Sequence, residues 1–152
     1  MSSRYTVETN GDIALTAATA KTVLSYIAGS NAPMRVIEME LGFDGVNTTG
    51  EPVTVELCKS TEAGAGTATS HTILQSGGPT RTAQGTAKRN FTAEPTVLTV
   101  IKRWLVHPQT GRTWQFPLGR EPEQNTGAQA LVLRCTAPAN VNCQGYMEVE
   151  EG

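Results

Sequence analysis

Hydrophobic and polar side chains alternate along RVIEMELGF, from Arg35 to Phe43, and this alternation indicates the fold class. The apolar residues fall on one face and two glutamates on the other: Ile37, Met39, Leu41 and Phe43 against Glu38 and Glu40. A repeat of two residues is that of a β-strand with one buried side, whereas an amphipathic helix repeats every ~3.6 residues. The stretch therefore predicts a half-buried strand.

The same pattern recurs elsewhere in the chain. PVTVELCKS (Pro52 to Ser60) predicts a strand that starts at the proline, where no ladder donor is lost. We expect its inward residues to be Val53, Val55 and Leu57 and its outward residues to be Thr54, Glu56 and Cys58. Two further strands are expected to bury one face each: Leu131, Leu133 and Cys135 in ALVLRC, and Val141, Cys143, Met147 and Val149 in NVNCQGYMEVE.

VLTVIKRWLVH (residues 97–107) is apolar on both faces, which is typical of a strand at the centre of a sheet, although a buried helix could look similar. The composition of LTAATAKTVLSYIAG (Leu15 to Gly29) is compatible with either a helix or a strand. Its alanines favour a helix, whereas Thr19, Thr22, Val23 and Ile27 favour a strand. We interpret it as extended.

Turn signals separate these segments. Asn-Gly in TNGD (Thr9 to Asp12) predicts a hairpin between RYTVE and DIALT. VHPQTGRTWQF predicts a second hairpin, with Pro108 and Gly111 in its turn and Trp104 facing Trp114 across the strands. In its second strand Trp114, Phe116 and Leu118 are expected on one face.

Two stretches of low hydrophobicity are expected to be loops that project from the scaffold, Ser60 to Ser70 and Ser76 to Asn90. Together the segments predict an all-β protein of eight to ten strands in two packed sheets, a β-sandwich resembling a jelly roll with long loops. The length of 152 residues predicts one domain, 1–152, with a short N-terminal arm over about residues 1–6.

The composition argues against several classes of partner. A net charge of −2 lacks the clustered cations that phosphate backbones require, so nucleic acid is not expected as a partner. No run approaches the ~20 apolar residues of a membrane span, and the first residues do not resemble a signal peptide. We therefore expect no membrane association and a protein that is made in the cytoplasm.

The residues that could carry chemistry do not form a recognisable motif. Three cysteines without CxxC spacing and two distant histidines, His71 and His107, predict neither a metal site nor a cofactor. His107 stands beside a turn with no nucleophile to activate, and GAGTAT (Gly64 to Thr69) lacks the lysine of a phosphate loop. NTT at Asn47 and NFT at Asn90 match the glycosylation triplet only by chance in a cytoplasmic chain.

Cys135 and Cys143 flank TAPANVN and could face each other on the inner side of a hairpin. We expect buried free thiols rather than a disulfide, because the cytoplasm is reducing. The cations Arg81, Lys88 and Arg89 form the one locally positive stretch, which is either ordinary solvated surface or a contact to an acidic protein surface.

A family resemblance is carried by the order of these strand and turn signatures. FDG leads into PV-V-L, then come FTAEPT, VHPQTG with FPLGRE, and LRCTAPANVN. In this order the chain resembles small structural proteins encoded in the head-gene regions of tailed bacteriophages, over nearly its whole length. The matching positions are interpreted as fold determinants: Phe43, Asp44, Gly45, Pro52, His107, Pro108, Gly111, Pro117, Gly119 and Glu121.

The resemblance implies a non-enzymatic decoration (cement) protein on the outside of the virion capsid, bound to the major capsid protein and often trimeric. Self-association is also expected from the symmetry of a capsid lattice. Candidate contact elements are the N-terminal arm, Ser60 to Ser70 and the basic stretch, so the candidate contact residues are Ser2, Ser3, Arg4, Tyr5, Arg81, Lys88 and Arg89.

Two other functions compete with this interpretation. A tail or baseplate protein that binds host glycans would use exposed aromatic side chains such as Trp104, Trp114 or Tyr146. A hydrolase would need paired carboxylates in a cleft, for which Glu38 and Glu40 are the candidates.

Overall fold

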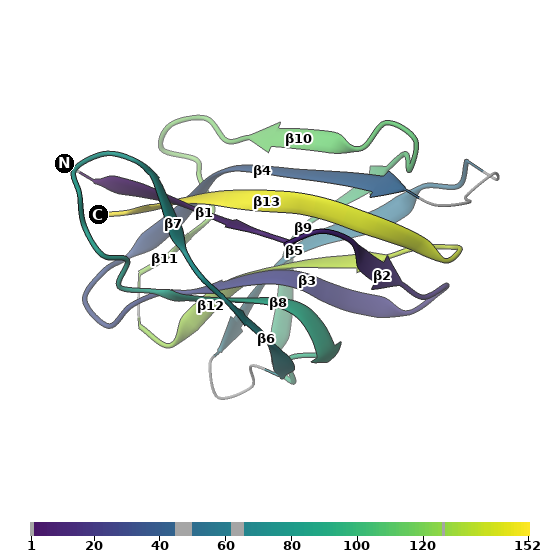
Figure 1. Ribbon diagram of the computed structural model, residues 1–152, viewed down its shortest axis with the longest axis horizontal. Helices are drawn as coiled ribbons and strands as arrows, with labels where there is room; N and C mark the ends of the chain where they lie inside the picture. Colours follow the sequence, from purple (N-terminus) through teal and green to yellow (C-terminus); the bar gives the residue numbers. More distant parts are fainter. Residues whose placement is uncertain (1, 45–49, 62–65, 126) are drawn as a thin grey trace.

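The computed structural model describes residues 2–44, 50–61, 66–125 and 127–152, in which every helix or strand is a β-strand. Sheet A has the order β10-β4-β13-β1-β7, with β2 on β13 and β11 on β4, and sheet B has the order β6-β8-β3-β12-β5-β9. All paired strands are antiparallel, and the two sheets pack face to face (Figure 1). The two-sheet β-sandwich predicted from the sequence is confirmed.

The strands of sheet A are β1 (Ser3–Glu8), β2 (Ile13–Leu15), β4 (Met34–Asp44), β7 (Leu74–Gly77), β10 (Arg112–Gln115), β11 (Glu123–Gln124) and β13 (Val141–Glu151). Those of sheet B are β3 (Ala20–Ile27), β5 (Val53–Thr61), β6 (Thr67–His71), β8 (Thr86–Ala93), β9 (Leu98–Val106) and β12 (Gln129–Thr136). Leu15 to Gly29 is extended over β3, as expected.

The main core lies between the sheets and is built from the inward row of each long strand. The expected inward residues of β5, β12 and β13 are all buried in it: Val53, Val55, Leu57, Leu131, Leu133, Cys135, Val141, Cys143, Met147 and Val149. Pro52 directly precedes β5, in the position predicted for it. Alternation therefore predicted the core correctly on these three strands.

On β4 the predicted inward row is wrong at Ile37. Glu38 pairs with Glu148 and Val36 pairs with Val149, so Ile37 is an extra residue in a β-bulge. The bulge changes the phase of the strand, and Val36 is fully buried instead while Ile37 is half-buried. Phe43 is also only half-buried and packs at the edge of the core.

The hairpin predicted at TNGD does not form. Asn10 and Gly11 do take positive φ values, 53° and 94°, as the Asn-Gly signal indicates. However, β1 and β2 both pair with β13, β1 with its last residues and β2 with its first. β1 and β2 therefore run in the same direction along β13, and the turn between them does not reverse the chain.

The second predicted hairpin is also wrong, because β9 belongs to sheet B and β10 to sheet A. Residues 107–111 form an arch between the sheets, in which the N–H groups of Thr110 and Gly111 donate to the His107 carbonyl. A side chain could not replace hydrogen at Gly111, since its φ is 63° and a Cβ would lie 2.5 Å from the Leu41 carbonyl oxygen. Residues 137–140 likewise cross from β12 in sheet B to β13 in sheet A.

Two further expectations about burial are corrected. The 97–107 segment forms β9 at the edge of sheet B and is largely exposed, whereas it was expected at a sheet centre. Conversely, Glu56 and Cys58 point away from the main core as predicted but are buried, at 5% and 0% exposure.

A second layer of chain causes this burial on the outer face of sheet B. The segment after β8 leaves the β3 side of the sheet and reaches β9 on the β5 side, so it crosses the outer face above β12. Beneath it Ile27, Cys58, Ala130 and Val132 form a small second cluster, against which Leu98 and Val100 pack. We call residues 93–97 the cover.

Candidate interaction surface

The charged residues of the strands are divided between the two sheets, although the whole chain is nearly neutral. The strands of sheet A carry Glu8, Glu38, Glu40, Asp44, Glu123, Glu148, Glu150 and Glu151 against Arg4, Arg35 and Arg112. The strands of sheet B carry Lys21, Lys59, Lys88, Arg89, Lys102, Arg103 and Arg134 against Glu56. The net charge of −2 therefore conceals an acidic sheet and a basic sheet.

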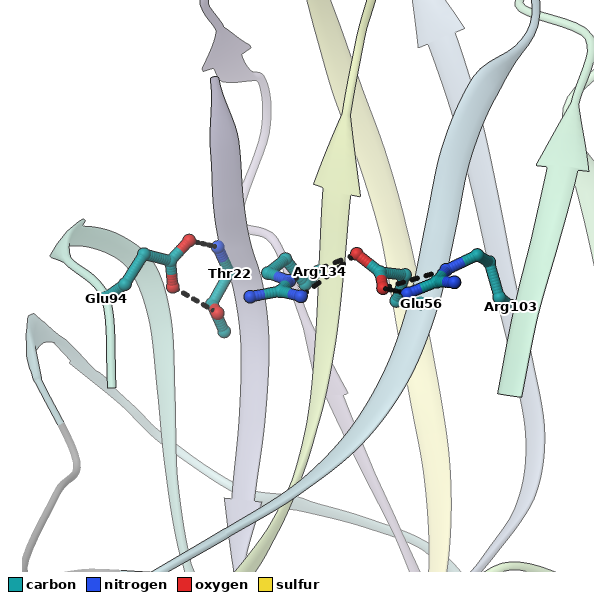
Figure 2. A network of polar contacts seen from close by, with 5 residues as sticks. All are labelled: Thr22, Glu56, Glu94, Arg103 and Arg134. Carbon is teal, nitrogen blue, oxygen red and sulfur yellow. Dashed lines mark hydrogen bonds and ion pairs between the residues drawn. The ribbon is translucent and has the colours of Figure 1, made fainter. Parts of the chain in front are cut away.

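A row of polar contacts crosses the outer face of sheet B (Figure 2). The carboxylate of Glu56 on β5 accepts hydrogen bonds from Arg134 of β12, at 3.2 Å from Nε, and from Arg103 of β9, at 2.8 Å from Nη2. At the other end of the row, Glu94 of the cover accepts bonds from the N–H and the hydroxyl of Thr22, both at 2.5 Å. An ion pair thus holds β9 on the sheet, and hydrogen bonds to a carboxylate hold the cover.

The row ends at an edge of the sandwich where β9 of sheet B and β10 of sheet A lie close together. Trp104 of β9 contacts Trp114 of β10, with ring centroids 5.0 Å apart and planes tilted by 46°. The contact predicted between the two tryptophans is confirmed, but it joins the sheets rather than two strands of a hairpin. The Arg112 guanidinium lies 5.4 Å from the Trp114 ring, within range of a cation–π interaction.

An open groove of about 420 Å³ runs along this β9–β10 edge. It is lined by Lys102, Arg103, Trp104, Arg112, Thr113, Trp114, Gln115 and Phe116. Three of these side chains are cationic and none is a carboxylate, and only Arg103 forms an ion pair within the described part of the chain. The groove is therefore an aromatic slot with positive charge on both walls.

Most of the exposed large apolar side chains belong to the segments of this edge. Among the described residues, the exposed large hydrophobics are Leu74, Val97, Ile101, Leu105 and Leu118. All but Leu74 belong to β9 or to the segments that flank β9 and β10. Leu118, expected on the same face as Trp114 and Phe116, is 87% exposed on the turn after β10. Grouped apolar exposure of this kind marks protein interaction sites.

The N-terminal residues do not form the expected arm. Ser3, Arg4 and Tyr5 belong to β1, which pairs with β13 on one side and β7 on the other. Ser3 and Tyr5 are buried, and the Ser2 hydroxyl donates to the Glu150 carboxylate. Only Arg4 of the four predicted contact residues is exposed, and its guanidinium lies 3.7 Å from Glu148.

The predicted basic loop is likewise divided. Arg81 lies in an exposed segment, but its carbonyl accepts a hydrogen bond from the Tyr5 hydroxyl. Lys88 and Arg89 are half-buried in β8 between β3 and β6. The structure therefore does not bring Arg81, Lys88 and Arg89 together in one loop.

The expected Ser60–Ser70 loop is partly strand, since β5 runs to Thr61 and β6 begins at Thr67. Its residues 62–65, including Gly64, lie outside the described residues, as do Gly45 and Asn47. Asn90 is part of β8, with a φ of 52°.

The candidate catalytic residues lie apart from one another or form hydrogen bonds with neighbouring groups. The His107 ring is exposed, and its Nδ1 accepts the N–H of Gln109 in the arch. The Glu38 carboxylate accepts hydrogen bonds from the Tyr146 hydroxyl and the Gln115 side-chain amide. These two hydrogen bonds lower the pKa of Glu38. Glu40 is the exposed partner of Tyr146 along β13. Within the described ranges, no three histidine, cysteine or acidic residues form a group that could hold a metal.

The three cysteines are free and buried. Cys135 and Cys143 face each other across the core, and their mutual hydrogen bond together with burial raises the pKa of Cys135 well above its ordinary value. Burial raises the pKa of Cys58 to about 11. Free thiols were expected at these positions, and they are found as thiols rather than as a disulfide.

Sequence reasoning did not find the β9–β10 edge as a surface, although it recognised the density of tryptophan and arginine there. The signal that could have indicated it is the mixture on β9, where Lys102 and Arg103 interrupt an apolar run. Charges within an apolar strand are typical of a sheet edge.

In the described ranges, no helix is long and apolar enough to cross a membrane. No family model, curated protein or solved structure matches this chain.

Proposed function

We propose that this chain is a non-enzymatic structural protein of a tailed-phage virion, a decoration protein that binds the outer surface of the capsid and stabilises the head. The proposal combines the resemblance of its strand and turn signatures to head-region proteins with one observation. That observation is the β9–β10 edge, which carries exposed apolar side chains and two cations, Lys102 and Arg112, that form no ion pair within the described residues.

Such an edge is suited to docking rather than to catalysis. Its apolar residues provide area to bury, and its cations provide orientation toward an acidic surface. A contact of ~800 Å² per partner is typical of specific complexes, but much of its gross energy is offset by the loss of freedom on association. Decoration overcomes this limit through many copies, because each bound copy or subunit raises the effective concentration of the next contact.

The proposed partner is the major capsid protein, and the proposed assembly is a homo-oligomer, with a trimer favoured. The place of action is the capsid exterior. The contact residues assigned by this proposal differ from those expected from the sequence, since Ser3 and Tyr5 are buried and the β9–β10 edge is exposed.

The test is binding to undecorated capsids, with occupancy measured by cosedimentation and cryo-electron microscopy. The Leu105→Asp/Leu118→Asp variant removes the apolar part of the edge, and we expect at least a tenfold loss of affinity. Leu74→Asp is the matched control, because Leu74 is 63% exposed but lies on β7 at the opposite side of sheet A. Failure of the unmodified protein to bind, or an equal loss in the control, would overturn the proposal.

A further inference from the structure

We propose that β9 accepts an extended acidic segment of a partner protein as an added strand, with a carboxylate between Lys102 and Arg112 and apolar side chains on Trp104 and Leu105. The proposed function supplies only the identity of the partner, a capsid subunit. The chemistry of the docked segment is argued from the β9–β10 edge itself.

The backbone of β9 is the first part of the argument. Among the strands of the described residues, β9 is the last of sheet B and pairs with β5 alone. The register shifts at Ile101, after which Lys102 to Val106 pair regularly with Leu57 to Val53. The other side of this five-residue stretch thus presents N–H and C=O groups that pair with no described strand, the feature that strand addition uses.

The side chains of β9 define what an added strand would meet. Lys102, Trp104 and Val106 are paired with core residues of β5, so they point toward sheet A. Arg103 and Leu105 are paired with Glu56 and Thr54 and point toward the outer face. An antiparallel guest would therefore place one apolar residue opposite Leu105, the next opposite Trp104, and an acidic residue two positions later opposite Lys102.

Charge favours an acidic guest. Lys102 and Arg112 stand on opposite walls of the groove, and none of the described carboxylates lines it. Arg103 is already held by Glu56, 2.8 Å from its Nη2, so it contributes less to a guest. A carboxylate that enters the groove meets two cations without displacing an existing ion pair.

The same charges disfavour a second copy of this strand. Antiparallel pairing of β9 with its own copy about Lys102 would oppose lysine to lysine and place both Arg103 side chains nearby. The acidic residues of sheet A lie mainly on β4 and β13, which pair with neighbours on both sides and cannot be donated as an added strand. These features favour a segment of a different protein as the guest.

The groove also has an unmatched donor. Trp114 is 5% exposed, and its indole N–H has no acceptor among the described residues. A buried donor without an acceptor destabilises the state in which it is found. A guest whose carbonyl or carboxylate reaches the groove would offer this group an acceptor after a small shift of the ring.

The test uses the intact protein and a synthetic decapeptide, acetylated and amidated, that repeats the order valine, isoleucine, threonine, glutamate. Both tryptophans of the chain line the groove, so tryptophan fluorescence excited at wavelengths that tyrosine does not absorb reports binding there. We expect the glutamate peptide to bind at least tenfold more tightly than its glutamine analogue, and amide resonances of residues 102–106 to shift. N-methylation of alternate peptide bonds should abolish binding, because it removes the donors of the added strand.

On the protein side, Lys102→Gln/Arg112→Gln should reduce binding of the glutamate peptide to the level of the glutamine peptide. Lys88→Gln, on β8 away from the groove, should leave it unchanged. Equal binding of the two peptides, retained binding of the N-methylated peptide, or no effect of the double variant would each overturn the inference.

Capsid binding separates this inference from the proposed function. Undecorated capsids that bind the Lys102→Gln/Arg112→Gln variant as tightly as the unmodified protein would overturn the inference and leave the proposed function standing. Binding of the glutamate peptide without any binding to capsids would support the inference and overturn the proposed function.

Discussion

The two sides of the sandwich differ in their hydrogen bonds and in the side chains that they expose. At the β6–β7 side, the chain crosses between the sheets through Thr72 and Ile73, and the segment that follows β7 is tied down by buried polar groups. The Ser3 hydroxyl donates to the Pro79 carbonyl at 2.8 Å, and the fully buried Glu151 carboxylate accepts the N–H groups of Gln84 and Gly85 at 2.9 and 2.8 Å. These hydrogen bonds hold the segment after β7 against β1 and β13, although the buried Nε of Arg89 on β8 has no partner among the described residues.

The β9–β10 side has a groove lined by aromatic and cationic side chains, and exposed apolar side chains lie on β9 and beside β10. The comparison of the two sides indicates which of them is suited to bind a partner. A side whose donors and acceptors are satisfied internally contributes stability, whereas a side with unmatched charge and exposed apolar area contributes binding. Substitutions should therefore separate the two sides, with large effects on stability at the first and small ones at the second.

The largest effect is expected from deletion of Ser2 to Tyr5 at the β6–β7 side. The deletion removes half of β1 and the buried Tyr5 side chain, and Tyr5→Ala alone should cost about 3–5 kcal/mol. We expect the deleted chain to lack a cooperative unfolding transition in circular dichroism. Tyr5→Phe, which removes only the hydroxyl bond to Arg81, should cost about 1 kcal/mol. A deletion variant with an unchanged denaturation midpoint would show that β1 is a dispensable arm after all.

Glu56→Ala should have the next largest effect. The Glu56 side chain is 6% exposed and is bound to two arginines, of which Arg103 is 63% exposed and Arg134 is 21% exposed. After the change water can solvate Arg103, but it can reach Arg134 only in part. We therefore expect the free energy of unfolding, measured by urea denaturation, to fall by about 2–3 kcal/mol. Glu40→Gln, an exposed carboxylate on sheet A, is the control and should change stability by less than about 0.5 kcal/mol. Similar losses in both variants would contradict the role assigned to the row.

A smaller effect is expected from pH at the β6–β7 side. The His71 Nε2 accepts the N–H of Glu8 at 3.3 Å, and burial lowers the pKa of His71 despite the opposing effect of Glu8. Below pH 6.5 the His71 imidazole binds a proton more readily in the unfolded chain than in the folded chain. The free energy of unfolding should therefore keep its full His71 contribution above that pH and should decrease as the pH falls further. The measurement is the free energy of unfolding at pH 7.5 and 5.5, with His71→Gln as the variant that should weaken the dependence. An unchanged dependence in that variant would assign the effect to other groups.

The smallest effect on stability is expected at the β9–β10 edge. Leu105 and Leu118 are 68% and 87% exposed, so Leu105→Ser/Leu118→Ser should alter the free energy of unfolding by no more than about 0.5 kcal/mol. Thermal and urea denaturation would check this. A loss above about 2 kcal/mol would mean that these leucines belong to the fold, and the contrast between the two sides would fail.

Alternation of side chains predicted the sandwich and much of its core, because burial between two sheets imposes a period of two on every long strand. It failed at Ile37, where a bulge opposite Glu148 and Val149 changes the phase without any local signal in RVIEMELGF. Turn signals predicted local geometry correctly and topology incorrectly. Asn10 and Gly11 adopt the expected dihedrals, but whether a turn reverses a strand or only interrupts it depends on the neighbouring strand.

The candidate surface was harder to predict for a related reason. Val97 to His107 reads as a central strand because it is apolar on both faces, yet β9 is an edge strand. Its outer-face residues Leu98 and Val100 pack with the cluster beneath the cover, and Leu105 is left exposed. Which apolar side chains are covered depends on where the cover crosses, and that is a property of the assembled fold.

The alternation of the chain between the two sheets has a consequence for assembly kinetics. Most consecutive strands lie in opposite sheets, so neither sheet can be completed until segments far apart in sequence have met. Folds dominated by such distant pairings fold slowly, on the scale of milliseconds to seconds, since each pairing must first close a long loop. The same interlacing means that neither layer can be peeled away by itself. We expect the chain to unfold as one unit and, once folded, to persist under mechanical load.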